Sequence, residues 1–186
     1  MNSLSSAAAS KKSRYAPVAI CLHWLLALLI VGMVALGWYM LSIEDTPGSD
    51  WYFMLHKSIG IIVIVLVLLR IIWRSGHKPD PLPSHLPQWQ VVAANMTHRL
   101  LYIAMIAMPL AGITGAMLSK DGIALFGVEL PRLVSENGDL SEIFFSFHSI
   151  IAWIFVALIS LHVVAALKHL LSKDGVFQRM WLFQKK

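Results

Sequence analysis

Four long runs of apolar residues alternate with short polar segments along the chain. The runs cover residues 16–40, 51–73, 91–118 and 142–171, approximately. Each could cross a bilayer as an α-helix, which takes about 20 predominantly apolar residues. The pattern therefore predicts an all-α integral membrane protein built as a four-helix antiparallel bundle.

The polar segments between the runs are rich in turn-forming residues. Residues 46–49 read Thr-Pro-Gly-Ser, residues 78–87 hold four prolines, and residues 136–139 read Glu-Asn-Gly-Asp. Such clusters mark loops. Residues 122–134 are moderately apolar but too short to span, so we expect them at the membrane interface. The predicted organisation is an N-terminal tail at 1–14, a four-helix membrane domain at 15–175 and a basic tail at 176–186. Residues 1–10 are small and polar, which is typical of disorder.

Composition agrees with a membrane protein. Hydrophobic residues make up 58% of the 186 residues, which is too apolar for a soluble domain of this size. The first run is longer than the apolar part of a signal peptide and lacks a small-residue cleavage site, so we interpret it as a retained spanning helix. Cys21 is the single cysteine, which excludes a disulfide framework and a C-x-x-C-H site for covalent haem.

The basic residues predict the orientation. Their net excess of +5 is spread over the ends of the apolar runs, which indicates topology rather than nucleic-acid binding. With the N-terminus inside, twelve basic residues lie on the cytoplasmic side: Lys11, Lys12, Arg14, Arg70, Arg74, Lys78, Arg99, Lys168, Lys173, Arg179, Lys185 and Lys186. The other side holds three: Lys57, Lys120 and Arg132. The positive-inside rule therefore predicts that both termini are cytoplasmic.

Histidine is the residue that carries candidate chemistry. Six of the eight histidines lie inside or at the ends of the apolar runs: His23, His56, His98, His148, His162 and His169. An ionisable side chain inside a membrane is costly and suggests a functional site. His77 and His85 fall in the proline-rich loop, where we expect them to be solvated.

The predicted topology sorts these histidines by depth. His148 and His162 are fourteen residues apart on the fourth helix, which is almost four turns, so they share a face about 21 Å apart. His56 then lies at the outer level with His148, and His23 at the inner level with His162. Two imidazoles that face each other across a bundle are a common way to hold a b-type haem. The alternative for a single membrane histidine is a hydrogen bond between helices.

Arg70 follows His56 by fourteen residues, so it faces inward at the inner level. A buried cation needs a partner, and none of the predicted spans has an acidic residue in its inner half. A haem propionate would serve, although an arginine that reaches to lipid headgroups is an equal alternative.

His98 and His169 form a third set at the cytoplasmic interface. Histidines there could donate hydrogen bonds and protons to a quinone, or they could be polar helix ends in water. The sequence assigns no catalytic residue.

Together these residues resemble the bacterial cytochrome b561 family, small four-helix dihaem cytochromes of the inner membrane. The resemblance rests on these motifs in order: His23-Trp24, His56 with Gly60, Arg70, His98-Arg99-Leu100-Leu101-Tyr102, Pro109-Leu110-Ala111-Gly112, His148, and the stretch from Leu161 to His169. It covers nearly the whole chain apart from the tails.

The resemblance implies a cytochrome b domain with two non-covalent b-type haems. His23 with His162, and His56 with His148, would be the axial ligands of the haem irons. It also implies electron transfer to ubiquinone, with His98 and His169 at the quinone. Some members resemble superoxide oxidases, which pass electrons from periplasmic superoxide to ubiquinone. The outer loops depart from this, since they carry eight acidic residues against three basic ones, whereas a site that collects an anion should be locally positive.

Two other functions stay open. The chain could be a cytochrome b subunit that anchors a peripheral dehydrogenase or hydrogenase in a respiratory chain. It could also be a haem-free transporter whose histidines titrate, although its spans lack a chain of acidic partners.

Overall fold

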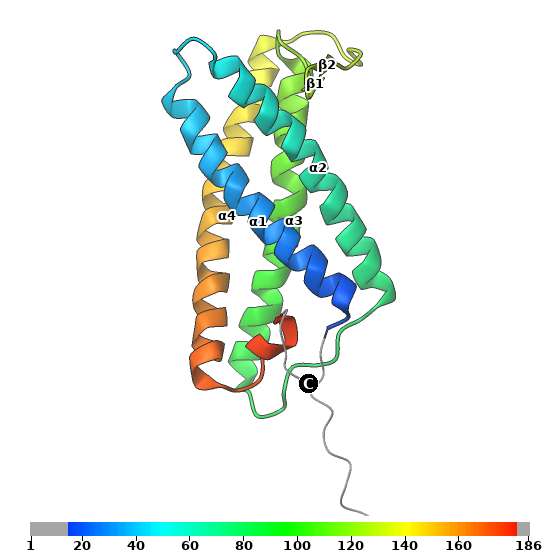
Figure 1. Cartoon of the computed structure of the whole chain (residues 1–186), viewed down its shortest axis with the longest axis vertical. Helices are drawn as coiled ribbons and strands as arrows, with labels where there is room; N and C mark the ends of the chain where they lie inside the picture. The colour runs from blue at the N-terminus through cyan, green and yellow to red at the C-terminus, as the bar shows by residue number, and fades with distance from the viewer. Residues whose placement is uncertain (1–14, 182–186) are drawn as a thin grey trace, which may run out of the picture.

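Four long helices form the protein, in the order that the apolar runs predict (Figure 1). The computed structural model describes residues 15–181. The helices are α1 (Pro17–Ser42), α2 (Ser49–Gly76), α3 (Gln88–Leu118) and α4 (Gly138–Ser172). All four are long and apolar enough to cross a membrane, which confirms the all-α membrane bundle. The N-terminal tail at 1–14 and the last five residues of the C-terminal tail lie outside the described residues.

Local sequence explains where the helices begin and end. Pro17 begins α1, where its missing N–H costs nothing. Gly48 precedes α2 with φ +90°, a conformation that glycine adopts without strain. The Asn137 side chain accepts the N–H of Leu140 and caps α4, which ends at Lys173 in the left-handed conformation.

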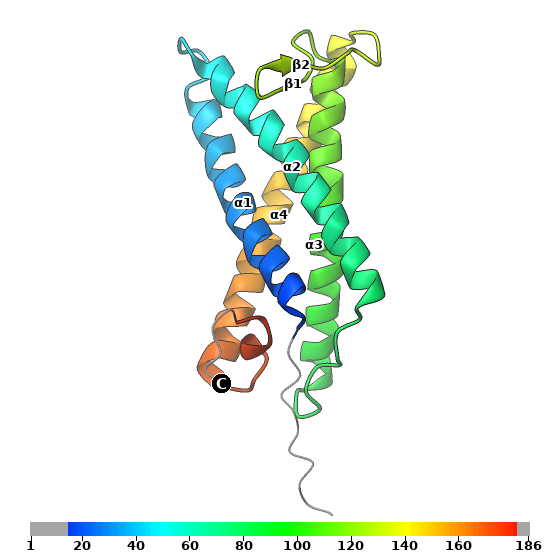
Figure 2. The same ribbon diagram turned by 45° about the vertical axis from the view of Figure 1, so that its right-hand side comes forward.

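Two small elements lie at opposite ends of the bundle (Figures 1 and 2). The strands β1 (Ala124–Leu125) and β2 (Val128–Glu129) form a hairpin within the segment expected at the interface. The short 3₁₀ helix η1 (Phe177–Met180) folds within the predicted basic tail, against the end of α4. We call these two ends of the molecule the hairpin end and the terminal end.

The exposed surface of the bundle is apolar, whereas its core is small. Large apolar side chains face outward along all four helices; Leu28, for example, is 73% exposed. Such a surface suits lipid rather than water. The buried core lies between the helices and consists of Leu26, Ile30, Val63, Val67, Ala104 and Phe155.

The helices pack as two close pairs. The helix α4 packs along α3, and α1 packs along α2, whereas α4 approaches α1 and α2 only loosely. Residues that meet across this loose contact therefore have to bridge it with their side chains.

Candidate functional site

One pair of histidines meets inside the bundle near the terminal end. The rings of His23 on α1 and His162 on α4 have their centres 6.1 Å apart, with their planes at 78°. We call these residues the terminal-end pair. They bridge the loose contact between α1 and α4.

A second pair repeats this geometry near the hairpin end. The ring centres of His56 on α2 and His148 on α4 are also 6.1 Å apart, and the planes again cross at 78°. We call these residues the hairpin-end pair. The structure thus brings together the two sets of rings that depth alone matches.

The ring separation fits one metal ion between each pair. A metal–imidazole bond is about 2.0–2.1 Å long and a ring nitrogen lies about 1.1 Å from its ring centre, so two axial imidazoles have centres about 6.3 Å apart. Among the described residues, no group of three or more His, Cys, Asp or Glu side chains could hold a metal. Two ligands per site suit an iron whose remaining ligands come from a porphyrin.

His148 is held in the orientation of a metal ligand. Its Nδ1 lies 2.8 Å from the backbone carbonyl oxygen of Met108 on α3. Since a carbonyl only accepts, Nδ1 carries the proton and donates it, which leaves the lone pair on Nε2 free. A hydrogen bond of this kind on the second ring nitrogen commonly orients metal-bound histidines.

Gly112 makes this orientation possible. A Cβ atom at residue 112 would lie 2.8 Å from Nδ1 of His148, closer than real Cβ atoms come. The imidazole can therefore lie against the α3 backbone only because residue 112 has no side chain. The sequence places Gly112 in a motif of the third helix, but the contact with His148 depends on how α3 and α4 pack.

His56 carries a buried nitrogen that lacks a partner. Its Nδ1 makes no hydrogen bond among the described residues. A buried polar atom without a partner is costly, and a bound metal is a partner that an imidazole nitrogen takes. Gly37 on α1 lies beside this edge of the ring, where a Cβ atom would be 3.4 Å from Cε1 and 3.9 Å from Nδ1 of His56.

The hairpin is fastened beside His56. The buried hydroxyl of Ser58 donates to the carbonyl of Ala124 and accepts the N–H of Phe126. The ammonium of Lys57 donates to the carbonyl of Gly122 at 3.1 Å. These bonds fix the loop between α3 and α4 over the hairpin-end pair.

Arg70 lies at the terminal-end pair, at the level that its spacing from His56 predicts. Its guanidinium donates to the hydroxyl of Tyr102 and to the carbonyl of Ala19, and Nη2 lies 3.5 Å from Nδ1 of His23. No carboxylate pairs with Arg70 in residues 15–181. The guanidinium therefore has a positive charge to offer a bound anion beside these histidines.

His98 and His169 separate in the structure, although the sequence places them at a similar depth. The ring of His98 lies beside that of His162, with centres 5.4 Å apart, so it joins the terminal-end pair. His169 instead contacts Asp174, with 2.5 Å between Nδ1 and Oδ2. The chain turns back there through the left-handed Lys173 and Gly175, which places a carboxylate beside the helix end.

The Asp174 carboxyl group holds this turn. Burial raises its pKa, but hydrogen bonds from His169 and from the Val176 N–H outweigh burial and hold the pKa below its usual range. A carboxylate with a lowered pKa stabilises the fold above its unfolded pKa, and loses this contribution as pH falls through the folded value.

We expect Asp174→Asn to loosen residues 173–181 and to remove an acid-dependent step. In the unsubstituted protein, amide hydrogen exchange in this segment should rise as the pH falls below the ordinary range of an aspartate pKa, because the carboxylate then becomes protonated. In the variant, amide exchange in this segment should be faster over the whole pH range. After correction for the intrinsic exchange rate, it should not depend on pH. Asp80→Asn is the matched control, since Arg179 uses the backbone carbonyl of Asp80. An unchanged acid step in Asp174→Asn would contradict the assignment.

The segment after α4 covers the terminal end, a role that sequence analysis did not foresee. The Trp24 indole N–H donates to the carbonyl of Met180 at 2.8 Å. The buried Arg179 guanidinium donates to the carbonyls of Asp80 and Pro81 and stacks on Tyr15. These contacts join Tyr15, the segment after α4 and the loop before α3 at the terminal end.

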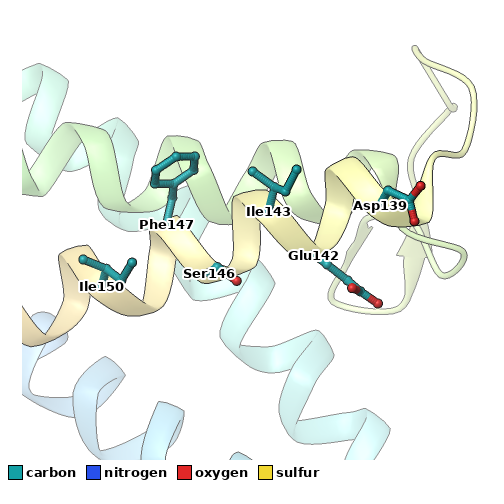
Figure 3. A pocket seen from close by; sticks show the side chains of 6 residues that line it. All are labelled: Asp139, Glu142, Ile143, Ser146, Phe147 and Ile150. Atoms are coloured by element: carbon teal, nitrogen blue, oxygen red, sulfur yellow. The ribbon is translucent and has the colours of Figure 1, made fainter.

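A shallow hollow on the outside of α4 is separate from these histidines (Figure 3). Asp139, Glu142, Ile143, Ser146, Phe147 and Ile150 line it. All six lie on one helix near the hairpin end, along the lipid-facing surface, so the hollow lacks the convergent polar groups of a binding site.

Comparison with known proteins identifies the family of this chain. The sequence profile of the family described as prokaryotic cytochrome b561 matches residues 14–182. The chain is 35% identical over 176 residues to cytochrome b561 homolog 2 of Escherichia coli (strain K12), which covers 90% of both chains. It is 30% identical over 176 residues to cytochrome b561 homolog 1 of the same strain, covering 90% of this chain and 97% of the relative.

A further relative carries a more specific name. The chain is 29% identical over 171 residues to the Yersinia pestis protein named "Probable superoxide oxidase CybB", covering 90% of this chain and 95% of the relative. The family match spans all four helices and every membrane histidine described above. The chain therefore belongs to the prokaryotic cytochrome b561 family and is a multi-pass bacterial membrane protein, a b-type haem cytochrome of electron transport.

Proposed function

We propose that this cytochrome binds two b-type haems and passes electrons from periplasmic superoxide to ubiquinone. The observation that carries the proposal is the repeated histidine geometry, two pairs with ring centres 6.1 Å apart at two levels of one bundle. Two equivalent sites at two depths suit a path across a membrane better than a single site would.

The two histidine pairs would hold the haems, and Arg70 would bind beside one of them. His23 with His162, and His56 with His148, would hold the irons of the two haems. Arg70 pairs with a haem propionate beside His23, since it lies there without a carboxylate partner in the described chain. When bound, each haem supplies a centre that takes up and releases one electron.

The buried core between the two pairs keeps the path dry. Phe155 is seven residues from both His148 and His162 on α4, hence about 10 Å from each along the helix, and it is 1% exposed. Leu26, Ile30, Val63 and Val67 surround it. These apolar side chains exclude water, so charge moves between the pairs through a medium of low dielectric constant.

We place the terminal end in the cytoplasm of a bacterial inner membrane. All but three of the fifteen basic residues lie in the tails, in the loop between α2 and α3, or in the adjoining helix ends, as the positive-inside rule requires. The hairpin end is then periplasmic. Lys57 next to His56, together with Arg132 on the neighbouring loop, supplies a local positive charge among the acidic residues there.

Quinone reduction belongs at the terminal end. Two superoxide anions each lose one electron to become dioxygen, and one ubiquinone takes up these two electrons and two protons to become ubiquinol. His98 lies beside His162 and can donate a hydrogen bond to a quinone carbonyl oxygen. His169 and Asp174 lie closer to the aqueous side. They can supply the quinone site with protons from the water.

Purified protein should reduce ubiquinone-1 when superoxide is supplied, with no partner protein present. The rate should vanish on addition of superoxide dismutase and in His148→Ala, which lacks a ligand of the hairpin-end pair. His85→Ala, which alters an exposed loop histidine, is the matched control. The proposal is wrong if the haem-loaded protein is inert to superoxide yet becomes reduced with the substrate of a co-purifying dehydrogenase, since the chain would then be the membrane subunit of that enzyme.

A further inference from the structure

A pocket at the terminal end shares Arg70 with the haem site proposed above, but Trp73, Arg74 and His77 in its lining have no role there. It is lined by the last turns of α2, the beginning of α1 and one residue of α3. Arg70, Trp73, Arg74 and His77 come from α2 and the residue after it, Tyr15 precedes α1, and Tyr102 comes from α3. Trp73, Arg74 and His77 lie at or just beyond the end of the apolar run 51–73.

The charged side chains that line this pocket are both positive. Two guanidinium groups face it, and no carboxylate lines it. Arg70 is held by Tyr102 and Ala19, and Arg74 lies over the ring of Tyr102 at 5.8 Å. Two cations one turn apart repel each other unless an anion lies between them.

Trp73 gives a second, independent indication of a ligand. Its indole Nε1 is buried and has no hydrogen-bond partner among the described residues. The ring is fixed by stacking on His77, with centres 4.0 Å apart and planes at 4°. A buried N–H without an acceptor is costly, so the Trp73 indole in the lining of this pocket still needs an acceptor.

The surroundings of the pocket indicate the source of the anion. On the same two helices, Val18, Leu69 and Ile72 are 43%, 49% and 67% exposed. These apolar side chains would contact acyl chains, whereas a free anion in water would gain nothing from them. Basic pockets between helices on the cytoplasmic side of a membrane are suited to anionic headgroups.

We propose that this pocket binds the phosphate of an anionic phospholipid, with Arg74 and the Trp73 indole N–H as its principal donors and Arg70 as a second cation. The lipid would join α1, α2 and α3 at the terminal end. The proposal does not depend on superoxide or quinone as substrates.

Lipid titration of the delipidated, haem-loaded protein, followed by native mass spectrometry in detergent, tests this site. Dioleoylphosphatidylglycerol should bind at least tenfold more tightly than dioleoylphosphatidylcholine, because one charge-assisted contact is worth about a factor of ten or more. Arg74→Gln should remove about tenfold of this preference, and Trp73→Phe should weaken phosphatidylglycerol binding with the ring stacking retained. Arg99→Gln, which removes an exposed charge of α3, is the matched control and should change neither.

Three results would overturn the proposal. Equal binding of the two lipids would show that charge is not recognised. Inorganic phosphate that competes at millimolar concentration would show a site for a free anion. Loss of haem, or a changed haem spectrum, in Arg74→Gln with unaltered lipid binding would assign the pocket to a haem propionate.

Discussion

Replacing His162 by alanine is expected to leave a folded bundle that retains one haem of two. His162 is the α4 member of the terminal-end pair, whereas His148 and His56 lie about four turns away. The pyridine haemochrome assay should therefore fall from about two haems per chain to about one. The redox difference spectrum should keep the component of the hairpin-end site.

The reciprocal variant and two controls make this result interpretable. His148→Ala should lose the other spectral component, and His85→Ala should lose none. His162→Met keeps an axial ligand, so it should retain haem with a raised midpoint potential, because methionine raises the potential of a haem iron. Loss of only the hairpin-end component in His162→Ala would contradict the pairing. Loss of both haems with intact helical circular dichroism would contradict two independent sites.

Gly112→Ala should lower haem affinity at the hairpin-end pair without touching any ligand. The new methyl group would collide with the ring of His148 at 2.8 Å, so the imidazole has to move away from the Met108 carbonyl. Loss of such an orienting hydrogen bond typically costs about 10–100-fold in metal affinity. We expect this loss in haem titrations of the apoprotein, with the terminal-end component unchanged.

Gly37→Ala is the matched control for this effect. Its methyl group would lie 3.4 Å from His56, close to ordinary van der Waals contact, and it would break no hydrogen bond of His148. Near-normal haem affinity is therefore expected in Gly37→Ala. Equal losses in the two variants would mean that tight packing around the histidines matters, rather than the orientation of His148 by α3.

The helices could be predicted from the sequence because the bilayer leaves few choices. A span without water has to satisfy its own backbone hydrogen bonds, so a sufficiently long apolar run becomes a helix. The predicted run 16–40 is the helix Pro17–Ser42, and the predicted run 91–118 is Gln88–Leu118. The differences lie at the ends, where caps such as Asn137 extend a helix beyond its apolar part.

Depth along a spanning helix could be predicted for the same reason. A rise of about 1.5 Å per residue converts spacing into height, so His148 and His162 identified two levels before any contact was known. His23 on α1 lies at the predicted level of His162, and His56 on α2 at that of His148. The structure shows both matches as ring contacts.

The neighbour that each histidine side chain contacts could not be predicted from residue spacing. His98 and His169 lie at a similar predicted depth, but α3 presents His98 to His162, whereas the turn at Lys173 and Gly175 gives His169 the carboxylate of Asp174. Which residue an imidazole contacts depends on how each helix is rotated and on where the chain folds back. Neither leaves a regular signal in the order of residues.

The sequence by itself determined the four membrane helices, the levels of their histidines and the resemblance to a dihaem family, because membrane thickness and helical rise translate order into height. Only the tertiary structure decided how each ring is held. It placed the Met108 carbonyl and the bare backbone of Gly112 against His148, Arg70 against His23, and the indole of Trp73 in a pocket with two arginines. These contacts join residues from different helices, and they arise from side-chain packing at distances of a few ångströms, which the periodicity of a single helix does not encode.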